Sequence, residues 1–194
     1  ASLAVNGQQS TIFNISINAN TPVGTLAQFP FDLTDGVYSH NNTFSQTIGI
    51  IDEDYETGDF TQYAWVNDPV FPWTIDNSNV YEGNNSSRSG AGLPDGEVSH
   101  LDINVDVTAP GDISFYKFVS SEEDYDYLQF YIDGNKQGEW SGIDNAWSFV
   151  SFPVTVGNHD LEWEYDKDGS TFDGQDCAWL DYIVFPPIDL GQTT

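Results

Sequence analysis

Apolar and polar side chains alternate with a period of two along most of this 194-residue chain. The clearest run is LDINVDVT at residues 101–108, in which every second side chain is apolar until the closing threonine. Such alternation is typical of a β-strand with one face in a core and the other in water. No window of useful length has a convincing period of 3.6, so we expect almost no helix.

Other segments have the pattern or composition of strands: 11–17, 26–33, 43–48, 112–119, 128–132, 148–154, 160–165 and 178–185. Asp133 and Gly134 follow one of them, and both residue types accept positive φ angles, which predicts a hairpin returning through residues 137–141. Antiparallel strands separated by turns rich in Gly, Pro, Asn and Asp indicate an all-β protein with a β-sandwich.

The composition excludes several classes of protein. With 31 acidic residues against 4 Lys plus Arg, the formal charge is −27, which argues against binding to nucleic acids or anionic lipid surfaces. An aromatic content of 15% argues against a disordered acidic tail. The single cysteine, Cys177, excludes an internal disulfide framework, and we expect it to be a small buried residue. Because salty or calcium-rich surroundings would screen the surplus acid, we expect an extracellular protein, secreted or at a cell surface.

The composition shifts near residue 50, and we place a domain boundary there. Residues 1–49 hold three or four short strands, which rarely close a stable sandwich alone. The edges of such a sheet would need another strand or another chain. We expect the main sandwich at residues 50–187 and a C-terminal linker at residues 188–194.

Ordered motifs in the second segment resemble a known family. They are DYETGDF at 54–60, PWTI at 72–75, YEG at 81–83, ISF at 113–115, SSE at 120–122, DYL at 126–128, FYIDG at 130–134, WSG at 140–142, KDGS at 167–170 and DCAWLDYI at 176–183. This order resembles the MAM-like jelly-roll modules of secreted bacterial proteins, close to the cleaved-adhesin domains of gingipain-type surface proteases. Residues 1–49 resemble the last strands of the immunoglobulin-like domain that often precedes such a module, in which case the chain begins partway through that domain.

The resemblance implies an antiparallel jelly-roll β-sandwich that serves as a non-catalytic accessory module of an exported protein. Such modules commonly hold structural calcium, and their relatives bind glycans, peptides or host surface proteins. Matched by motif, Asp54 and Glu56 in the early acidic turn and Asp181 in the last strand would be the calcium ligands. The paired cysteines of animal MAM domains are missing here, so disulfide-dependent features do not carry over.

Residue chemistry supports calcium independently of the resemblance. Calcium binds six to eight hard oxygen ligands, and residues 52–56 place alternate carboxylates on one short turn. Asp181 interrupts an otherwise apolar strand face, where a carboxylate is costly to bury without a cation or hydrogen bonds. A second, weaker set surrounds two glycines and comprises Asp166, Asp168, Asp173 and Asp176. Solvated acidic loops that bind no ion are the alternative in both places.

No catalytic constellation is evident, and we expect a protein that is not an enzyme. His40, His100 and His159 lie in separate segments without metal-ligand spacing, so we interpret each as an exposed or edge-strand residue. No Gly-x-Ser-x-Gly turn occurs, and carboxylates are too abundant for any pair of them to suggest glycoside hydrolysis.

Aromatic residues are the candidates for ligand contact. A stacking platform for sugar rings or a peptide could include Trp65, Trp73, Tyr127 and Trp140. The alternative is that these side chains fill the core and the ends of the sandwich.

Three functions remain open. The first is a calcium-stabilised adhesive module that recognises a surface glycan, protein or peptide. The second is a structural subunit of an extracellular filament, in which another copy of the chain completes the N-terminal sheet by strand addition. The third is a carbohydrate-binding accessory module of a secreted hydrolase.

Overall fold

The computed structural model describes residues 15–18, 21, 26–34, 37, 39–90 and 92–189. The chain divides into two compact units, Ala1–Gly49 and Ile50–Thr194, which we describe separately. All regular elements within the described ranges are β-strands, and all their pairings are antiparallel. Among these residues, no helix is long and apolar enough to cross a membrane.

The first unit contains a two-stranded ribbon of β1 (Leu26–Thr34) and β2 (Ser39–Thr47). The rings of Phe29 and Phe44 stack across it with centroids 6.0 Å apart. The strand expected at 11–17 lies mostly outside the described residues, and its described part, 15–17, is not in a strand. The resemblance of this unit to an immunoglobulin-like domain stays a prediction.

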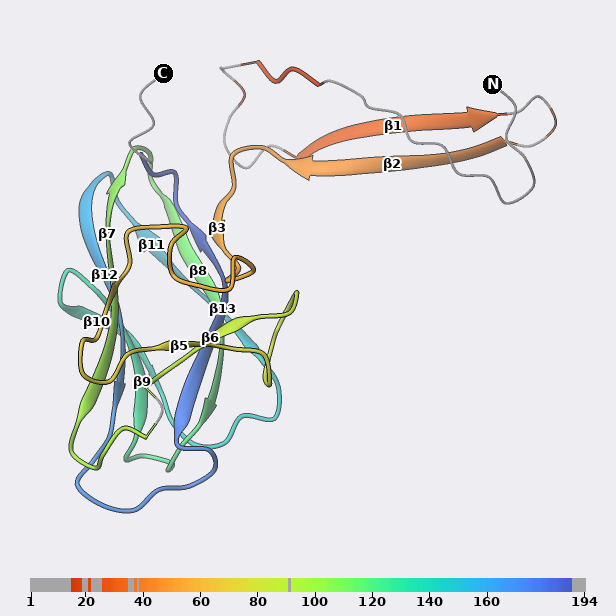
Figure 1. Cartoon of the computed structure of the whole chain (residues 1–194). Helices are drawn as coiled ribbons and strands as arrows, with labels where there is room; N and C mark the ends of the chain where they lie inside the picture. The colour runs from red at the N-terminus through yellow and green to blue at the C-terminus, as the bar shows by residue number, and fades with distance from the viewer. Residues whose placement is uncertain are drawn as a thin grey trace. The chain divides into compact units, whose positions relative to one another are not determined.

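The second unit is a sandwich of two sheets (Figure 1). One sheet has five strands in the order β10 (Asn135–Trp140), β9 (Tyr127–Ile132), β12 (Gly157–Asp166), β7 (Val98–Val107) and β4 (Val66–Asn67). The other has six strands: β11 (Ser148–Val154), β8 (Gly111–Ser120), β13 (Cys177–Phe185), β6 (Ser86–Arg88) and β5 (Thr74–Asp76) in order, with β3 (Ile51–Glu53) also paired to β13.

The strand pairs are nested along the chain. The hairpin β9–β10 lies innermost, β8 pairs with β11 around it, β7 pairs with β12 around those, and β3 and β6 pair with β13 outermost. Successive pairs fall in alternate sheets, which is the connectivity of a jelly roll. The predicted fold class, an antiparallel jelly-roll β-sandwich, is therefore confirmed.

The core lies between the inner faces of the two sheets. Phe115, Phe130 and Trp163 are fully buried there, with ring centroids 4.8–5.4 Å apart. On β7 the buried side chains of Leu101, Ile103, Val105 and Val107 point inward, as the alternation predicts. The intervening polar side chains consequently form the outer face of the five-stranded sheet.

Candidate functional site

A row of aromatic side chains covers part of the outer face of the six-stranded sheet. We call this row the aromatic face; it comprises Tyr81, Tyr116, Phe118, Trp147 and Phe149, and the fully buried Trp179 packs against Phe118. On β8, Ile113 and Phe115 fill the core, so the alternating residues Tyr116 and Phe118 point to the opposite side. The register places Phe149 of β11 beside Tyr116, and Trp179 of β13 beside Phe118.

The rings of the aromatic face form a continuous series of contacts. Tyr81 stacks on Tyr116 with centroids 3.5 Å apart and planes 14° apart, and the neighbouring Tyr116 hydroxyl is the main cause that raises the pKa of Tyr81 to about 12. The ring centroid of Trp147 lies 6.2 Å from that of Tyr81 and 5.9 Å from that of Phe118. Tyr81 is 41% exposed and Phe149 58%, so the series presents aromatic surface to solvent.

Asp181 positions the loop that carries Tyr81. Its Oδ2 accepts hydrogen bonds from the backbone N–H groups of Tyr81 and Glu82, at 2.8 and 3.2 Å, and its Oδ1 accepts one from Tyr182 at 2.7 Å. The side chain is fully buried, and this desolvation raises the pKa of its carboxyl to about 6. These hydrogen bonds are the compensation that a buried carboxylate on β13 requires.

Glu56 holds the other end of the same loop. Its Oε1 accepts hydrogen bonds from the backbone N–H groups of Asn84 and Asn85, at 2.6 and 2.8 Å. These bonds lower the pKa of the Glu56 carboxyl, the one from Asn84 most. Two of the predicted calcium ligands, Glu56 and Asp181, therefore fix the 81–85 loop from its two ends.

Asp54, the third predicted calcium ligand, accepts a hydrogen bond from the backbone N–H of Glu56 at 3.0 Å. All three predicted ligands therefore have hydrogen-bond partners within the protein. Carboxylates of this corner are electrostatic neighbours, since Asp52, Asp54 and Glu56 all raise the pKa of Glu82 after its desolvation. Asp54, Glu56 and Asp181 are not a group whose ligand atoms converge within 4.8 Å among the described residues. Calcium at this corner stays a prediction.

The second predicted calcium set is spread over several environments. A buried lysine, Lys167, lies 2.5 Å from Asp176 and 3.0 Å from Asp95. Asp168 and Asp173 each accept a backbone hydrogen bond within their own loop. Asp166 points to the outer face of the five-stranded sheet. The ammonium group of Lys167 therefore already supplies a positive charge to Asp176.

Three of the four aromatic residues proposed from the sequence as ligand contacts pack against the core. Trp73 is 1% exposed, and a side chain so deeply buried offers no face to a ligand. Trp65 and Trp140 are half-buried against core rings, and Trp65 also donates a hydrogen bond to Glu53 at 2.9 Å. Tyr127 lies on the outer face of the five-stranded sheet, opposite Asp166.

The aromatic face was not predicted from the sequence, although the alternation along β8 indicates part of it. Tyr116 and Phe118 lie an odd number of residues from the core residues Ile113 and Phe115, so they point to the other side of the strand. Nothing in the local sequence places Tyr81 on Tyr116, because that contact depends on Asp181 at the other end of the unit.

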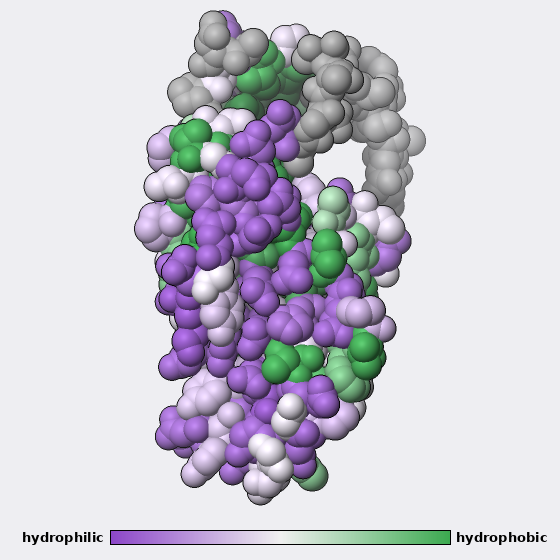
Figure 2. Space-filling view, turned by 90° about the vertical axis from the view of Figure 1, so that its left-hand side faces the viewer, coloured by the Kyte–Doolittle hydropathy of each residue, from purple (hydrophilic) through white to green (hydrophobic). Residues whose placement is uncertain are grey.

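The outer face of the five-stranded sheet is different in character. Figure 2 looks at the side of the sandwich where β7, β12 and β10 lie in Figure 1, and this side is mostly hydrophilic. His100 on β7 lies 2.8 Å from Glu162 and 3.7 Å from Glu164, both on β12. Together with Asp102, His100 and Glu162 form the one group of three potential metal-ligand atoms within 4.8 Å among the described residues.

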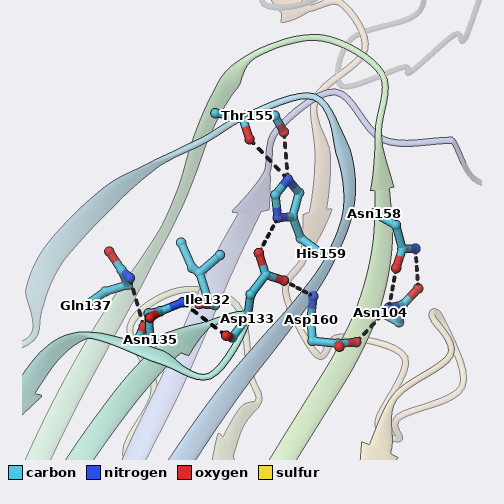
Figure 3. Close-up of polar contacts among 9 residues, drawn as sticks. All are labelled: Asn104, Ile132, Asp133, Asn135, Gln137, Thr155, Asn158, His159 and Asp160. Carbon is cyan, nitrogen blue, oxygen red and sulfur yellow. Dashed lines mark hydrogen bonds and ion pairs between the residues drawn. The ribbon is translucent and has the colours of Figure 1, made fainter.

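The other two histidines lie elsewhere. His40 is exposed on β2. Figure 3 shows His159 of β12 between Asp133 and Thr155, with its Nδ1 2.8 Å from the Asp133 carboxylate. Cys177 is buried, as expected, and its desolvation raises the pKa of the thiol to about 11.

No protein-family model matches this chain, and no curated protein matches it significantly by sequence. Among solved structures, it is similar to the CBM22-1 xylan-binding domain of Paenibacillus barcinonensis Xyn10C, with 16% identity, a TM-score of 0.49 and coverage of 75% of this chain and 96% of that one. It is also similar to TmCBM61 in complex with β-1,4-galactotriose, with 14% identity, a TM-score of 0.47 and coverage of 69% and 94%. A third is the secreted serine protease VesC from Vibrio cholerae, with 17% identity, a TM-score of 0.46 and coverage of 87% of this chain but 35% of that one.

These similarities are too distant to establish a function. The strand pairings of the chain itself define its fold. The specific resemblance to MAM-like and cleaved-adhesin modules stays a prediction.

Proposed function

We propose that residues 50–194 form a non-catalytic module that binds a neutral glycan on the aromatic face. The observation that carries the proposal is the continuous series of partly exposed rings from Phe149 through Tyr116 and Tyr81 to Trp147. Such rings offer flat apolar surfaces to the C–H faces of sugars, and tyrosine adds a hydroxyl that can bind sugar hydroxyls. A carbohydrate-binding module, the third function left open by the sequence, thus fits this surface better than the calcium-stabilised adhesive module that came first.

Polar groups beside the rings can orient a sugar. The indole of Trp147 donates a hydrogen bond to Asn79 Oδ1 at 3.1 Å, which fixes the orientation of the ring. Ser114 and Ser151 form the next cross-strand pair after Tyr116 and Phe149, two residues along on the same side of the sheet. Aromatic rings with nearby hydroxyl groups are typical of a small-molecule binding site.

The charge of the protein selects among glycans. At a formal charge of −27, the chain repels uronate or sulfated polymers at low salt. Arg88 is the cation on this side, and its guanidinium lies 5.5 Å from the ring centre of Trp179, where it is occupied by that contact. We therefore expect neutral polysaccharides to bind and acidic ones not to bind. An extracellular location, secreted or at a cell surface, belongs to the same proposal, because neutral polysaccharides of this kind are found there.

Affinity electrophoresis in gels containing soluble polysaccharides tests the proposal. Xylan and β-1,4-galactan are suitable first probes, because two of the similar structures bind xylan and β-1,4-galactotriose. Polygalacturonate is the acidic control. Retardation by at least one neutral polymer, reduced roughly tenfold or more in affinity by Tyr81→Ala or Trp147→Ala, is the expected result.

Tyr127→Ala is the matched control, because this tyrosine lies on the other sheet and was itself a candidate from sequence. If Tyr127→Ala abolished retardation while Tyr81→Ala left it intact, the site would lie on the five-stranded sheet. Migration unaffected by a broad panel of neutral polymers would contradict glycan binding altogether.

One observation favours a second function, the self-assembling structural subunit. Among the described residues, no third strand pairs with the β1–β2 ribbon, and its Leu33 and Phe44 are 59% and 53% exposed. Two-stranded ribbons are marginally stable alone, so a strand from another copy could complete this sheet. Light scattering that stays at the monomer mass over a wide range of protein concentration would oppose it.

A further inference from the structure

On the outer face of the five-stranded sheet, two neighbouring cross-strand pairs of β7 and β12, which we call rungs, differ in whether their carboxylates have a hydrogen-bond donor. In the first rung, Asn104 of β7 faces Asp160 of β12. The Asn104 amide donates a hydrogen bond to the Asp160 carboxylate at 2.6 Å, and Asn158 joins the same network (Figure 3). An amide donor thus satisfies the acidic group of this rung.

The next rung lacks such a donor. Asp102 of β7 faces Glu162 of β12, so two carboxylates are directly opposite each other. Like charges in this position destabilise a sheet. Asp102 Oδ1 is inaccessible to solvent and has no hydrogen-bond partner, which makes it a buried acceptor without compensation.

An imidazole completes the arrangement. His100 lies two residues before Asp102 on β7, so both side chains point outward. Its Nδ1 is 2.8 Å from Glu162 Oε1, and one ligand atom from each of His100, Asp102 and Glu162 lies within 4.8 Å of the other two. The surrounding charges are also mostly negative: Asp68, Asp160 and Glu164 face the group, and Lys136 acts from beyond Glu164.

We propose that His100, Asp102 and Glu162 bind a zinc ion that bridges β7 and β12. One imidazole nitrogen and two carboxylate oxygens are ligands that zinc accepts, whereas calcium prefers oxygen alone. The two carboxylates carry a charge equal and opposite to that of the ion, which removes the repulsion across the rung. Asp102 Oδ1 gains the partner that it lacks, and Glu164 is the nearest further carboxylate for a fourth position. The site is separate from the aromatic face and independent of glycan binding.

Zinc titration of the tag-free chain by isothermal calorimetry tests this proposal. The measurement is made at physiological salt, where the Debye length of about 8 Å weakens diffuse attraction of cations to the acidic surface. We expect one saturable zinc site per chain, and zinc binding there that neither calcium nor magnesium prevents. His100→Gln should lower the zinc affinity roughly tenfold or more, whereas His40→Gln, at an exposed histidine of β2, should leave it unchanged.

Asp102→Asn separates loss of the site from loss of the fold. An asparagine here recreates the amide–carboxylate rung of Asn104 and Asp160, so this variant should melt at or above the wild-type temperature in EDTA. It should nevertheless lose the increase in melting temperature that zinc gives the wild type, because only binding to the native state raises stability. Wild-type zinc affinity in Asp102→Asn, equal effects of the two histidine variants, or no saturable zinc binding at all would each overturn the proposal and leave only the hydrogen bond between His100 and Glu162.

Discussion

Gly83 shows how one backbone position controls the aromatic face. Its φ is +67°, in the left-handed region, and a Cβ added there would lie 2.5 Å from Glu56 Oε1. That oxygen accepts the hydrogen bonds from Asn84 and Asn85 that fix the loop bearing Tyr81. Glycine is therefore needed here for its conformation and for its lack of a side chain.

Gly83→Ala should lower the free energy of unfolding by more than Gly58→Ala, measured in urea. Gly58 has a similar φ of +79°, but a Cβ there would meet nothing within 4 Å, so its variant isolates the backbone cost of about 1–2 kcal/mol. The excess for Gly83→Ala measures displacement of Glu56, and it should come with weaker glycan binding. Equal destabilisation by the two variants would show that Glu56 moves aside freely.

At the scale of elements, one side chain ties the turn of the β9–β10 hairpin to β12, beyond the pairing of β9 with β12. Asp133 and Gly134 have φ angles of +52° and +70°, as two central residues of a tight hairpin turn require. The Asp133 carboxylate accepts a hydrogen bond from the backbone N–H of Asp160 at 3.0 Å and lies 2.8 Å from His159 Nδ1 (Figure 3). The same residue thus shapes the turn and joins it to the neighbouring strand.

Asp133→Ala should destabilise the protein by roughly 1–3 kcal/mol, because the substitution removes both contacts and because alanine tolerates a positive φ poorly. Asp133→Asn should cost less, since asparagine accepts this conformation and keeps one acceptor. The hydrogen bond from Asp160 is the main cause that lowers the pKa of Asp133. Its charge therefore contributes stability above about pH 4, and this contribution is lost as the pH falls through the lowered pKa. The gap between wild type and Asp133→Asn, measured by denaturation, should accordingly shrink in acid.

For the whole molecule, carboxyl groups with raised pKa values shape the response to mild acid, and three of them are shifted strongly. Asp102, Asp126 and Asp181 each have a pKa raised to about 6, mainly by desolvation, from an ordinary value of 3.8. Between these values the native state holds protons that the unfolded chain has released, so stability falls as the pH rises through this window and is level above it.

In EDTA, the melting temperature should therefore be higher near pH 5 than near neutrality. Carboxyl groups with lowered pKa values, such as Asp59 and Asp76, oppose this trend only at lower pH, because they titrate below the ordinary value. A melting temperature that falls steadily from neutrality to pH 5 would contradict the prediction.

Melting temperatures at the two pH values also test the calcium prediction. If Asp54, Glu56 and Asp181 hold a structural calcium ion, adding calcium after EGTA treatment should raise the melting temperature. The increase should be larger near neutrality than near pH 5, where a proton competes for Asp181. An unchanged melting temperature at both pH values would exclude structural calcium at this corner.

The sequence by itself determined the longer strands of the sandwich, the hairpin turn at Asp133 and which residues of β7 are buried, because alternation and turn preference are local properties of the chain. It did not predict the short strands β3 to β6, and the described part of the strand expected at 11–17 is not a strand. It also placed Asp181 correctly as a carboxylate that must be compensated, although the compensation observed is backbone N–H groups of the 81–85 loop. Only the tertiary structure decided that Trp73 fills the core while Tyr81 and Trp147 lie on a surface. It alone set His100 beside Glu162. Those outcomes depend on which distant strands pair and in which register, since a shift of one residue would turn every outward side chain of β12 toward the core.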